Sequence, residues 1–213
     1  MKTWTTKAVA ATALMVVTLL AASGAQATLF TRLNGQAVYD DQANLTWLQD
    51  ANYASTYYSA FSTFRTTGGN ETNYDFNGQM RWSTAMLWAA QLSIEGVIGW
   101  RLPAGPMDYS NRQAGSEMGG MFYNVLRGVA TNYNFFQNIQ SNDYWSGVPT
   151  TPSGSYAWGF DFLNGAQTSN RKTTNLFAWA VHDGDVPAPG TLALLGAGLL
   201  GWVGVKRARR ARA

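Results

Sequence analysis

The chain has 213 residues, one histidine and no cysteine, and its 15 Lys and Arg against 12 Asp and Glu give a formal net charge of +3. Without cysteine there are no disulfides, thiol nucleophiles or thiolate metal ligands, and one histidine leaves little material for a metal cluster or a Ser-His-Asp site. The positive charge is confined to the two ends, because residues 28–185 hold 8 Lys and Arg and 12 Asp and Glu, a net charge of −4. A mildly acidic region does not favour a nucleic-acid backbone, so we expect no nucleic-acid partner, and we expect neither a cofactor nor a bound metal.

The first 27 residues have the pattern of a secretory signal peptide. Two lysines precede the apolar stretch Ala8–Ala22, and Ala25 and Ala27 supply the small residues of a cleavage site. The pattern predicts an exported protein that begins at Thr28 after cleavage. An uncleaved Ala8–Ala22 would be a second membrane segment, and we favour the cleaved signal.

Short strands are expected next. Leu29–Leu33 and Gln36–Tyr39 flank Asn34-Gly35, a dipeptide typical of a type I′ β-hairpin. Asn44–Trp47 follows as a third short strand, and the polar segment Thr56–Asn77 is expected to be a loop.

Two amphipathic helices are expected in the middle of the chain. Ser83 is a candidate N-cap for a helix that runs to Leu92, and a second helix covers Ser116–Leu126. The segment Ala104–Gly115 is expected to be the loop between them. The apolar stripe of the first helix contains Ala85, Trp88, Ala89 and Leu92, and that of the second contains Met118, Met121, Phe122 and Val125.

The C-terminal half is expected to form strands at Tyr144–Gly147 and Tyr156–Phe162. After a turn at Asn164-Gly165, a third strand at Leu176–Val181 is expected to return beside the second. Alternation places four aromatic side chains of the second strand on one face, which is either a sugar-binding platform or the core face of a sheet. We favour the core, because buried aromatics stabilise a domain that lacks disulfides. The core is then expected to include Trp100, Trp145, Trp158, Phe160 and Trp179. A ligand platform would instead use tyrosines on loops, namely Tyr53, Tyr57, Tyr58, Tyr109 and Tyr133.

The carboxylates are scattered and indicate no enzyme class. A glycoside hydrolase needs two carboxyl groups about 5–10 Å apart, and no spacing in this sequence singles out a pair. Short acidic runs could offer oxygen ligands to calcium, but neither has the density of a calcium loop, and we expect a hydrogen-bonded turn. The hydrolase candidates are Asp108, Glu117, Asp143 and Asp161, and the calcium candidates are Asn142, Asp143, Asp183 and Asp185.

The last 28 residues form a sorting tail in which the apolar run Thr191–Val205 lies between a proline-containing motif and a basic end. Prolines keep the motif extended, and the basic residues hold the end in the cytoplasm. The tail resembles the PEP-CTERM signal, which is read by an exosortase, a membrane-embedded protease, although Ala188 replaces the central Glu of that family. The alternative is a plain membrane anchor, for which 15 residues are short against the ~20 of a spanning helix. The motif comprises Val186, Pro187, Ala188, Pro189 and Gly190, and the membrane-stop charges are Lys206, Arg207, Arg209, Arg210 and Arg212.

Six further segments occur in a recognisable order: Asp40–Tyr53, Arg81–Pro103, Ser116–Leu126, Tyr144–Gly147, Tyr156–Gly165 and Phe177–Val186. Among them, the most diagnostic residues are Trp100, Arg101, Leu102 and Pro103 together with Tyr144, Trp145 and Ser146. Residues 31–186 thereby resemble the Lcl C-terminal-type domain, a bacterial family of unknown function that often precedes a PEP-CTERM tail. The resemblance implies an α+β, C-type-lectin-like fold of twisted antiparallel strands with two helices. The motif residues are then expected to be structural, with Arg101 paired to a carboxylate such as Glu117.

These patterns divide the chain into a signal peptide (1–27), one domain (28–185) and a sorting tail (186–213) with a linker (186–190), an apolar helix (191–205) and a basic end (206–213). We expect a non-catalytic surface or extracellular-matrix protein that binds glycan or other envelope components. Its expected partners are the secretion machinery, an exosortase, a polysaccharide and, before processing, the membrane. The alternative is a secreted glycoside-hydrolase-like enzyme that uses an Asp/Glu pair.

Overall fold

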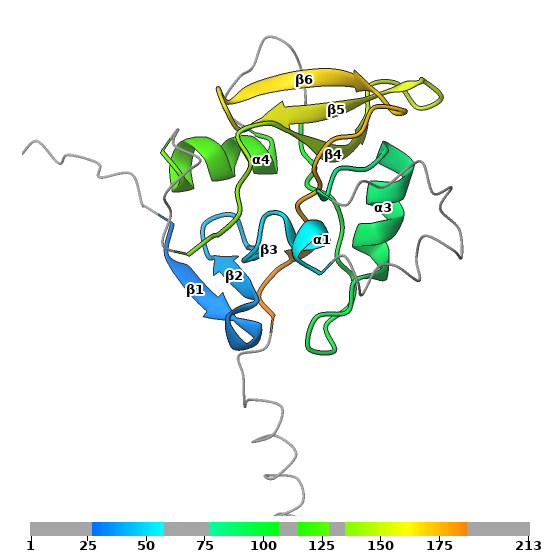
Figure 1. Ribbon diagram of the computed structural model, residues 1–213. Coiled ribbons are helices and arrows are strands. Elements are labelled where there is room, and N and C mark those ends of the chain that lie inside the picture. Colours follow the sequence, from blue (N-terminus) through cyan, green and yellow to red (C-terminus); the bar gives the residue numbers. More distant parts are fainter. Residues whose placement is uncertain (1–26, 58–76, 107–114, 128–134, 187–213) are drawn as a thin grey trace, which may run out of the picture.

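The structure, a computed structural model, describes residues 27–57, 77–106, 115–127 and 135–186 (Figure 1). This part of the chain contains two antiparallel sheets and a few helices, in agreement with the expected α+β class. No helix within these ranges is long and apolar enough to cross a membrane. Outside the described residues lie the expectations for the signal peptide before residue 27, for residues 187–213, and for Tyr58, Asp108, Tyr109 and Tyr133.

The first sheet brings the beginning and the end of the domain together. Its strands are β1 (Leu29–Arg32), β2 (Ala37–Asp40), β3 (Leu45–Leu48) and β7 (Val181–Asp183). They lie side by side in the order β1-β2-β3-β7, and each neighbouring pair is antiparallel. The three strands expected near the N-terminus are therefore confirmed, with small shifts at their ends.

The connection between β1 and β2 is the tight turn that Asn34-Gly35 predicts. Asn34 has a φ of 54° and Gly35 a φ of 92°, and the backbone N–H of Gln36 donates to the carbonyl of Leu33 at 3.0 Å. Positive φ at both central residues is what a type I′ turn requires, and Asn and Gly adopt it most readily. The ladder closes just outside this turn, between Arg32 and Ala37.

The second sheet contains β4 (Asp143–Pro149), β5 (Tyr156–Asp161) and β6 (Ala166–Arg171) in that order, all antiparallel. The expectation that Leu176–Val181 returns beside β5 is wrong, because β6 takes that place. Leu176–Val181 instead runs through the core and is buried at every position. Its side chains do not alternate between core and solvent, and before it enters β7 it makes only isolated bridges.

The helices are short apart from one. They are α1 (Tyr53–Thr56), α3 (Trp82–Gln91) and α4 (Glu117–Gly120), which continues into the π-helical turn η4 (Met121–Val125); the hairpin turn is η1 (Leu33–Gly35). The predicted apolar stripes of both long segments are buried. Ser116 caps α4 by accepting the N–H of Gly119 at 3.0 Å. The N-cap expected at Ser83 is wrong, because Arg81 occupies the N-cap position of α3 and Ser83 lies inside the helix.

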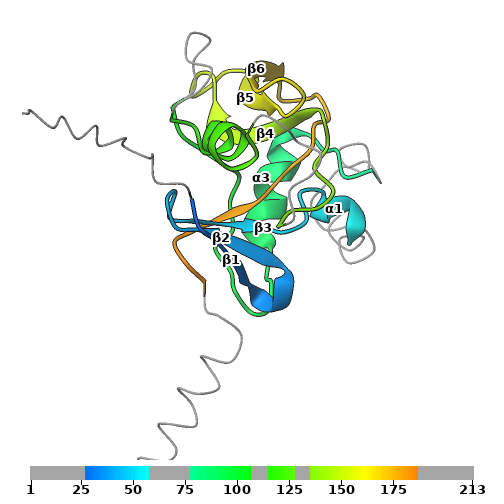
Figure 2. The same ribbon diagram turned by 90° about the vertical axis from the view of Figure 1, so that its left-hand side faces the viewer.

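The core lies between the two sheets. Figures 1 and 2 show the sheet β4-β5-β6 at one end of the molecule, the strands β1, β2 and β3 at the other, and α3 between them. The five aromatic residues expected in the core are all buried, at 8% exposure or less. Of the four aligned aromatics on β5 and just after it, Trp158, Phe160 and Phe162 are buried. Tyr156 is 38% exposed, and Arg171 lies over its ring at 5.4 Å. The core interpretation of that stripe is therefore correct except at its first residue.

Candidate functional site

The residues Trp100, Leu102 and Pro103 of the first diagnostic motif are buried and hold neighbouring segments in place. The indole N–H of Trp100 donates to the carbonyl of Val97 at 3.0 Å. The carbonyl of Pro103 accepts the N–H of Gly147 in β4 at 2.8 Å. These contacts give the motif a structural role.

Arg101, the remaining residue of that motif, joins three elements. Its Nη1 and Nη2 donate to Oε2 and Oε1 of Glu117, each at 2.8 Å, and its Nε donates to Oδ1 of Asp183 at 3.1 Å. Glu117 also accepts the N–H of Ala104 at 2.7 Å, so the predicted pair of Arg101 with Glu117 is confirmed. The hydrogen bonds that Arg101 donates to Glu117 are the main reason why the pKa of Arg101 is raised, and Arg101 in turn lowers the pKa of Asp183. This arrangement occupies the guanidinium and leaves it no free edge for substrate.

The second diagnostic motif, Tyr144-Trp145-Ser146, is buried in β4. The hydroxyl of Tyr144 accepts the N–H of Gln140 at 2.8 Å, and burial raises its pKa. The indole of Trp145 donates to the carbonyl of Met80 at 2.8 Å, and Oγ of Ser146 accepts the N–H of Val148 at 3.1 Å. Each polar group in the motif thus has a partner in the fold.

The carboxylates considered for hydrolysis have structural partners. Asp143 and Asp161 are opposite each other in β4 and β5. Oδ1 of Asp161 accepts the N–H of Leu163 at 2.8 Å and its Oδ2 accepts the side chain of Asn164 at 2.7 Å, which shapes the β5–β6 turn. Asp143 accepts the hydroxyl of Thr168 at 3.1 Å, and its pKa is raised mainly by burial.

The start of the expected tail is attached to the domain. Asp185 forms a two-pronged ion pair with Arg32, at 2.6 Å from Nε to Oδ1 and 2.8 Å from Nη2 to Oδ2. Val186, assigned from the sequence to the linker, is 2% exposed and belongs to the core. Ala27, expected just before the cleavage site, is partly buried against the core. Among the described residues, no group of three or more His, Cys, Asp and Glu could hold a metal ion.

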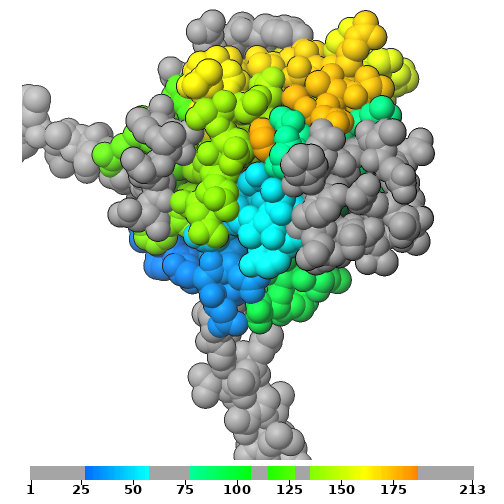
Figure 3. All heavy atoms as spheres, in the orientation of Figure 1, coloured from blue at the N-terminus to red at the C-terminus, as the bar shows by residue number. Residues whose placement is uncertain are grey.

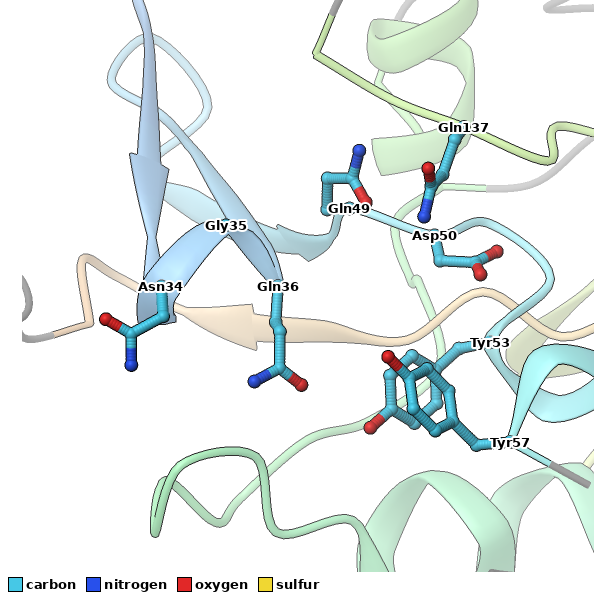
Figure 4. A pocket seen from close by; sticks show the side chains of 8 residues that line it. All are labelled: Asn34, Gly35, Gln36, Gln49, Asp50, Tyr53, Tyr57 and Gln137. Atoms are coloured by element: carbon cyan, nitrogen blue, oxygen red, sulfur yellow. The ribbon is translucent and has the colours of Figure 1, made fainter. Parts of the chain in front are cut away.

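Among the described residues, a surface pocket of about 150 Å³ is a candidate for ligand binding. It lies where the β1–β2 turn, the segment from β3 into α1 and the segment after residue 134 meet, and Figure 3 shows these blue, cyan and light-green parts in contact on one face. Its eight lining residues are Asn34, Gly35, Gln36, Gln49, Asp50, Tyr53, Tyr57 and Gln137 (Figure 4).

Two stacked tyrosines form the aromatic side of the pocket. Tyr53 and Tyr57 are four residues apart on and just after α1, so their rings lie one above the other, with centroids 4.2 Å apart and planes 27° apart. Tyr53 is buried, whereas Tyr57 is 41% exposed. In Figure 4 both phenol oxygens point toward the side of the pocket on which Gln36 lies. Both tyrosines were among those expected to form a loop platform.

Asp50 fixes the base of the pocket. It is 4% exposed, and it accepts hydrogen bonds from the N–H of Asn52 at 2.8 Å, the hydroxyl of Thr56 at 2.5 Å and the side chain of Asn138 at 3.0 Å. The neighbouring backbone forms a parallel bridge to Gln137. Because these bonds hold the start of α1, the two tyrosines are presented on a fixed frame.

Glu95 orients the opposite wall. It follows α3 in a turn closed by reciprocal bonds between Ile94 and Val97, at 3.0 and 2.9 Å. Its carboxylate accepts Nδ2 of Asn34 at 3.2 Å and Nε2 of Gln36 at 2.8 Å. Sequence reasoning found neither this wall nor the amide side chains, since only the tyrosines expected on loops pointed to a ligand platform.

Comparison with known families agrees with the expected resemblances. The Lcl C-terminal domain model matches residues 36–182, and the PEP-CTERM protein-sorting motif matches residues 185–210. A search of curated proteins gives no match. The first of these matches covers well over half of the chain, so the protein belongs to the Lcl C-terminal domain family and carries a PEP-CTERM sorting motif directly after that domain.

Proposed function

We propose that the protein is a non-catalytic component of the cell surface or extracellular matrix that binds glycan through the pocket between Gln36 and the tyrosine pair. The PEP-CTERM motif supports export to the cell envelope and processing by an exosortase. Within this proposal, the apolar run 191–205 holds the protein in the membrane until processing, and the fold is of the C-type-lectin-like kind.

The observation that carries glycan binding is the stacked pair Tyr53 and Tyr57 beside several amide side chains. Aromatic rings offer an apolar face to the C–H side of a sugar ring, and their hydroxyls and neighbouring amides can pair with sugar hydroxyls. Within the described part of the chain, the side-chain amides of Gln49 and Gln137 make no hydrogen bond. Those two amides are therefore available to a polar ligand.

The absence of catalysis is part of the proposal. Glu117 is engaged by Arg101, and Asp161 by the β5–β6 turn, so neither is poised to transfer a proton to a substrate. Incubation with the glycans that bind should release no new reducing ends. Hydrolysis that is lost in Asp143→Asn or Asp161→Asn would instead favour the glycoside-hydrolase alternative.

A glycan array probed with the purified protein tests the proposal. Tyr57→Ala should abolish or strongly weaken the signal, because Tyr57 is the exposed member of the stack. Tyr156→Ala is the matched control, since Tyr156 has a similar exposure, 38% against 41%, but lies on β5 outside the pocket. An equal loss of binding in both variants, or none in either, would remove the pocket from the argument.

The sorting half of the proposal has its own test. A periplasm-specific reporter joined after Gly190 should be active, and deletion of Lys206–Ala213 should release or mis-sort the protein, because basic residues near an anionic leaflet contribute about 1 kcal/mol each to retention. Reporter activity in the cytoplasm alone would contradict export.

A further inference from the structure

The hydrogen-bonding groups of the pocket wall have a defined polarity. Glu95 accepts the amide nitrogens of Asn34 and Gln36, so each amide directs its nitrogen toward Glu95 and keeps its oxygen for other donors. Figure 4 shows the side-chain oxygen of Gln36 on the side of the tyrosine pair. This wall therefore presents acceptors to a ligand.

The two charged side chains that line or orient the described part of the pocket are both acidic. Asp50 lines it and Glu95 stands behind the wall, whereas its eight lining residues include no Lys, Arg or His. The pKa of Tyr53 is raised, first by burial and then by repulsion from Tyr57, Asp50 and Glu95. Both the charges and the acceptors favour a ligand that is a donor with positive charge.

The tyrosine pair adds a second attraction for a cation. The face of an aromatic ring attracts an ammonium group, by about 0.5–1 kcal/mol at an exposed site. Tyr57 is 41% exposed, so one ring of the stack is open to a ligand. The pocket volume of about 150 Å³ is below the usual range for ligand sites and suits a single small ring.

We propose that the pocket binds a sugar unit that carries a free, protonated amine, as in a glucosamine-containing polysaccharide, and that it discriminates against uronate-containing polysaccharides. This assignment rests on the glycan-binding function proposed above. The ammonium group lies against the Tyr57 face and the oxygen of Gln36, and the ring hydroxyls pair with the amides of Gln49 and Gln137. A carboxylate placed there would be repelled by Asp50 and Glu95.

Three tetrasaccharides of equal length separate the possibilities: tetraglucosamine, tetra-N-acetylglucosamine and tetragalacturonate. Calorimetric titration of the purified protein at about pH 6, where the amine is protonated, should show tetraglucosamine binding at least about fivefold more tightly than the acetylated tetramer. Tetragalacturonate should not bind measurably. The affinity for tetraglucosamine should fall as salt is raised, because exposed charges are screened.

A charge-neutralising variant identifies the wall responsible. Glu95→Gln should reduce the affinity for tetraglucosamine about two- to fivefold more than the affinity for the acetylated tetramer, because the lost charge acts only on the protonated amine, whereas any reorientation of the Asn34 and Gln36 amides affects both ligands. Asp41→Asn removes one charge at the far end of β2, about 17 Å along the strand from Gln36, and should change nothing. Far-UV circular dichroism checks that both variants are folded.

The outcomes are distinguishable. If none of the three tetramers binds, the amine preference is wrong, and the glycan array decides separately whether the glycan-binding function also fails. If the acetylated tetramer or the uronate binds as tightly as tetraglucosamine, glycan binding stands and the preference for an amine is refuted. A lysine tetrapeptide that binds as tightly as tetraglucosamine would assign the pocket to protein side chains and would also overturn the sugar assignment.

Discussion

Two tryptophans in the centre of the core differ in one respect that mutation can isolate. Trp47 and Trp179 are 1% and 0% exposed, and their rings meet edge to face with centroids 5.0 Å apart. The indole N–H of Trp179 donates to the carbonyl of Leu48 at 2.7 Å. The indole nitrogen of Trp47 has no hydrogen-bond partner among the described residues. Replacing either tryptophan by Phe therefore removes similar apolar contacts. The polar effects are opposite, because Trp179→Phe removes a hydrogen bond whereas Trp47→Phe removes an unpaired donor.

The magnitudes follow from the contacts. Either replacement deletes part of a buried ring, which costs about 1–2 kcal/mol. Trp179→Phe also leaves the buried carbonyl of Leu48 unpaired, which adds about 1–3 kcal/mol, for a total of about 2–5 kcal/mol. Trp47→Phe removes an unpaired buried donor, so a relief of about 1–3 kcal/mol offsets the packing loss. The two variants should differ in their free energy of unfolding by at least about 2 kcal/mol.

Chemical denaturation of the purified proteins, followed by far-UV circular dichroism, measures this difference. The slope of the unfolding free energy against denaturant concentration should be the same in both variants, and only the midpoint should differ. The melting temperatures of the two variants should differ by at least about 4–8 °C for a domain of this size. Equal destabilisation by the two replacements would refute the reasoning, because it would show that the bond to Leu48 contributes nothing beyond ring packing.

Three further changes test other features. Glu117→Gln should cost about 1–3 kcal/mol in urea denaturation, because the partly buried Arg101 loses its two-pronged carboxylate partner and keeps only Asp183. Gly165→Ala should unfold at a clearly lower temperature than Gly96→Ala. Both glycines have positive φ, but an added Cβ would clash with the side chains of Tyr123 and Phe122 in the first and would meet nothing within 4 Å in the second. Asp143→Asn should raise the melting temperature at pH 7, and the gain should vanish below about pH 4. Burial raises the pKa of Asp143, so its ionisation opposes folding as pH rises.

The sequence predicted those elements whose local backbone preferences or hydrophobic patterns match their position in the fold. The turn at Asn34-Gly35 needed only its own φ preferences, and the stripe on α3 faces a core that the rest of the chain supplies. β6 was missed because its residues Ala166–Arg171 are polar or small, and none is buried. β6 is stabilised by pairing with β5 and by side-chain hydrogen bonds such as that from Asn170 to Thr168 at 2.9 Å. A periodic pattern of hydrophobic residues does not predict such interactions.

The pocket was only half visible in the sequence. Tyr53 and Tyr57 were among the tyrosines expected on loops, but the amide side chains come from residues about 20 positions earlier and about 80 later. Glu95, which orients that wall, lies 59 residues from Gln36. Contacts between residues so far apart in the sequence depend on how the two sheets are placed relative to each other, and local sequence patterns do not contain that information.

Under the sorting proposed above, the burial of Val186 would limit how far the domain can move from its point of attachment. Processing anywhere within Pro187–Gly190 leaves at most four residues beyond Val186, a tether of about 14 Å when fully extended. Arg32, which forms the ion pair with Asp185, precedes by two residues Asn34, which lines the pocket. A domain held so closely cannot reorient freely. Its pocket would therefore sample the polymer layer immediately above the attachment surface, where even weak binding sites act at high local concentration.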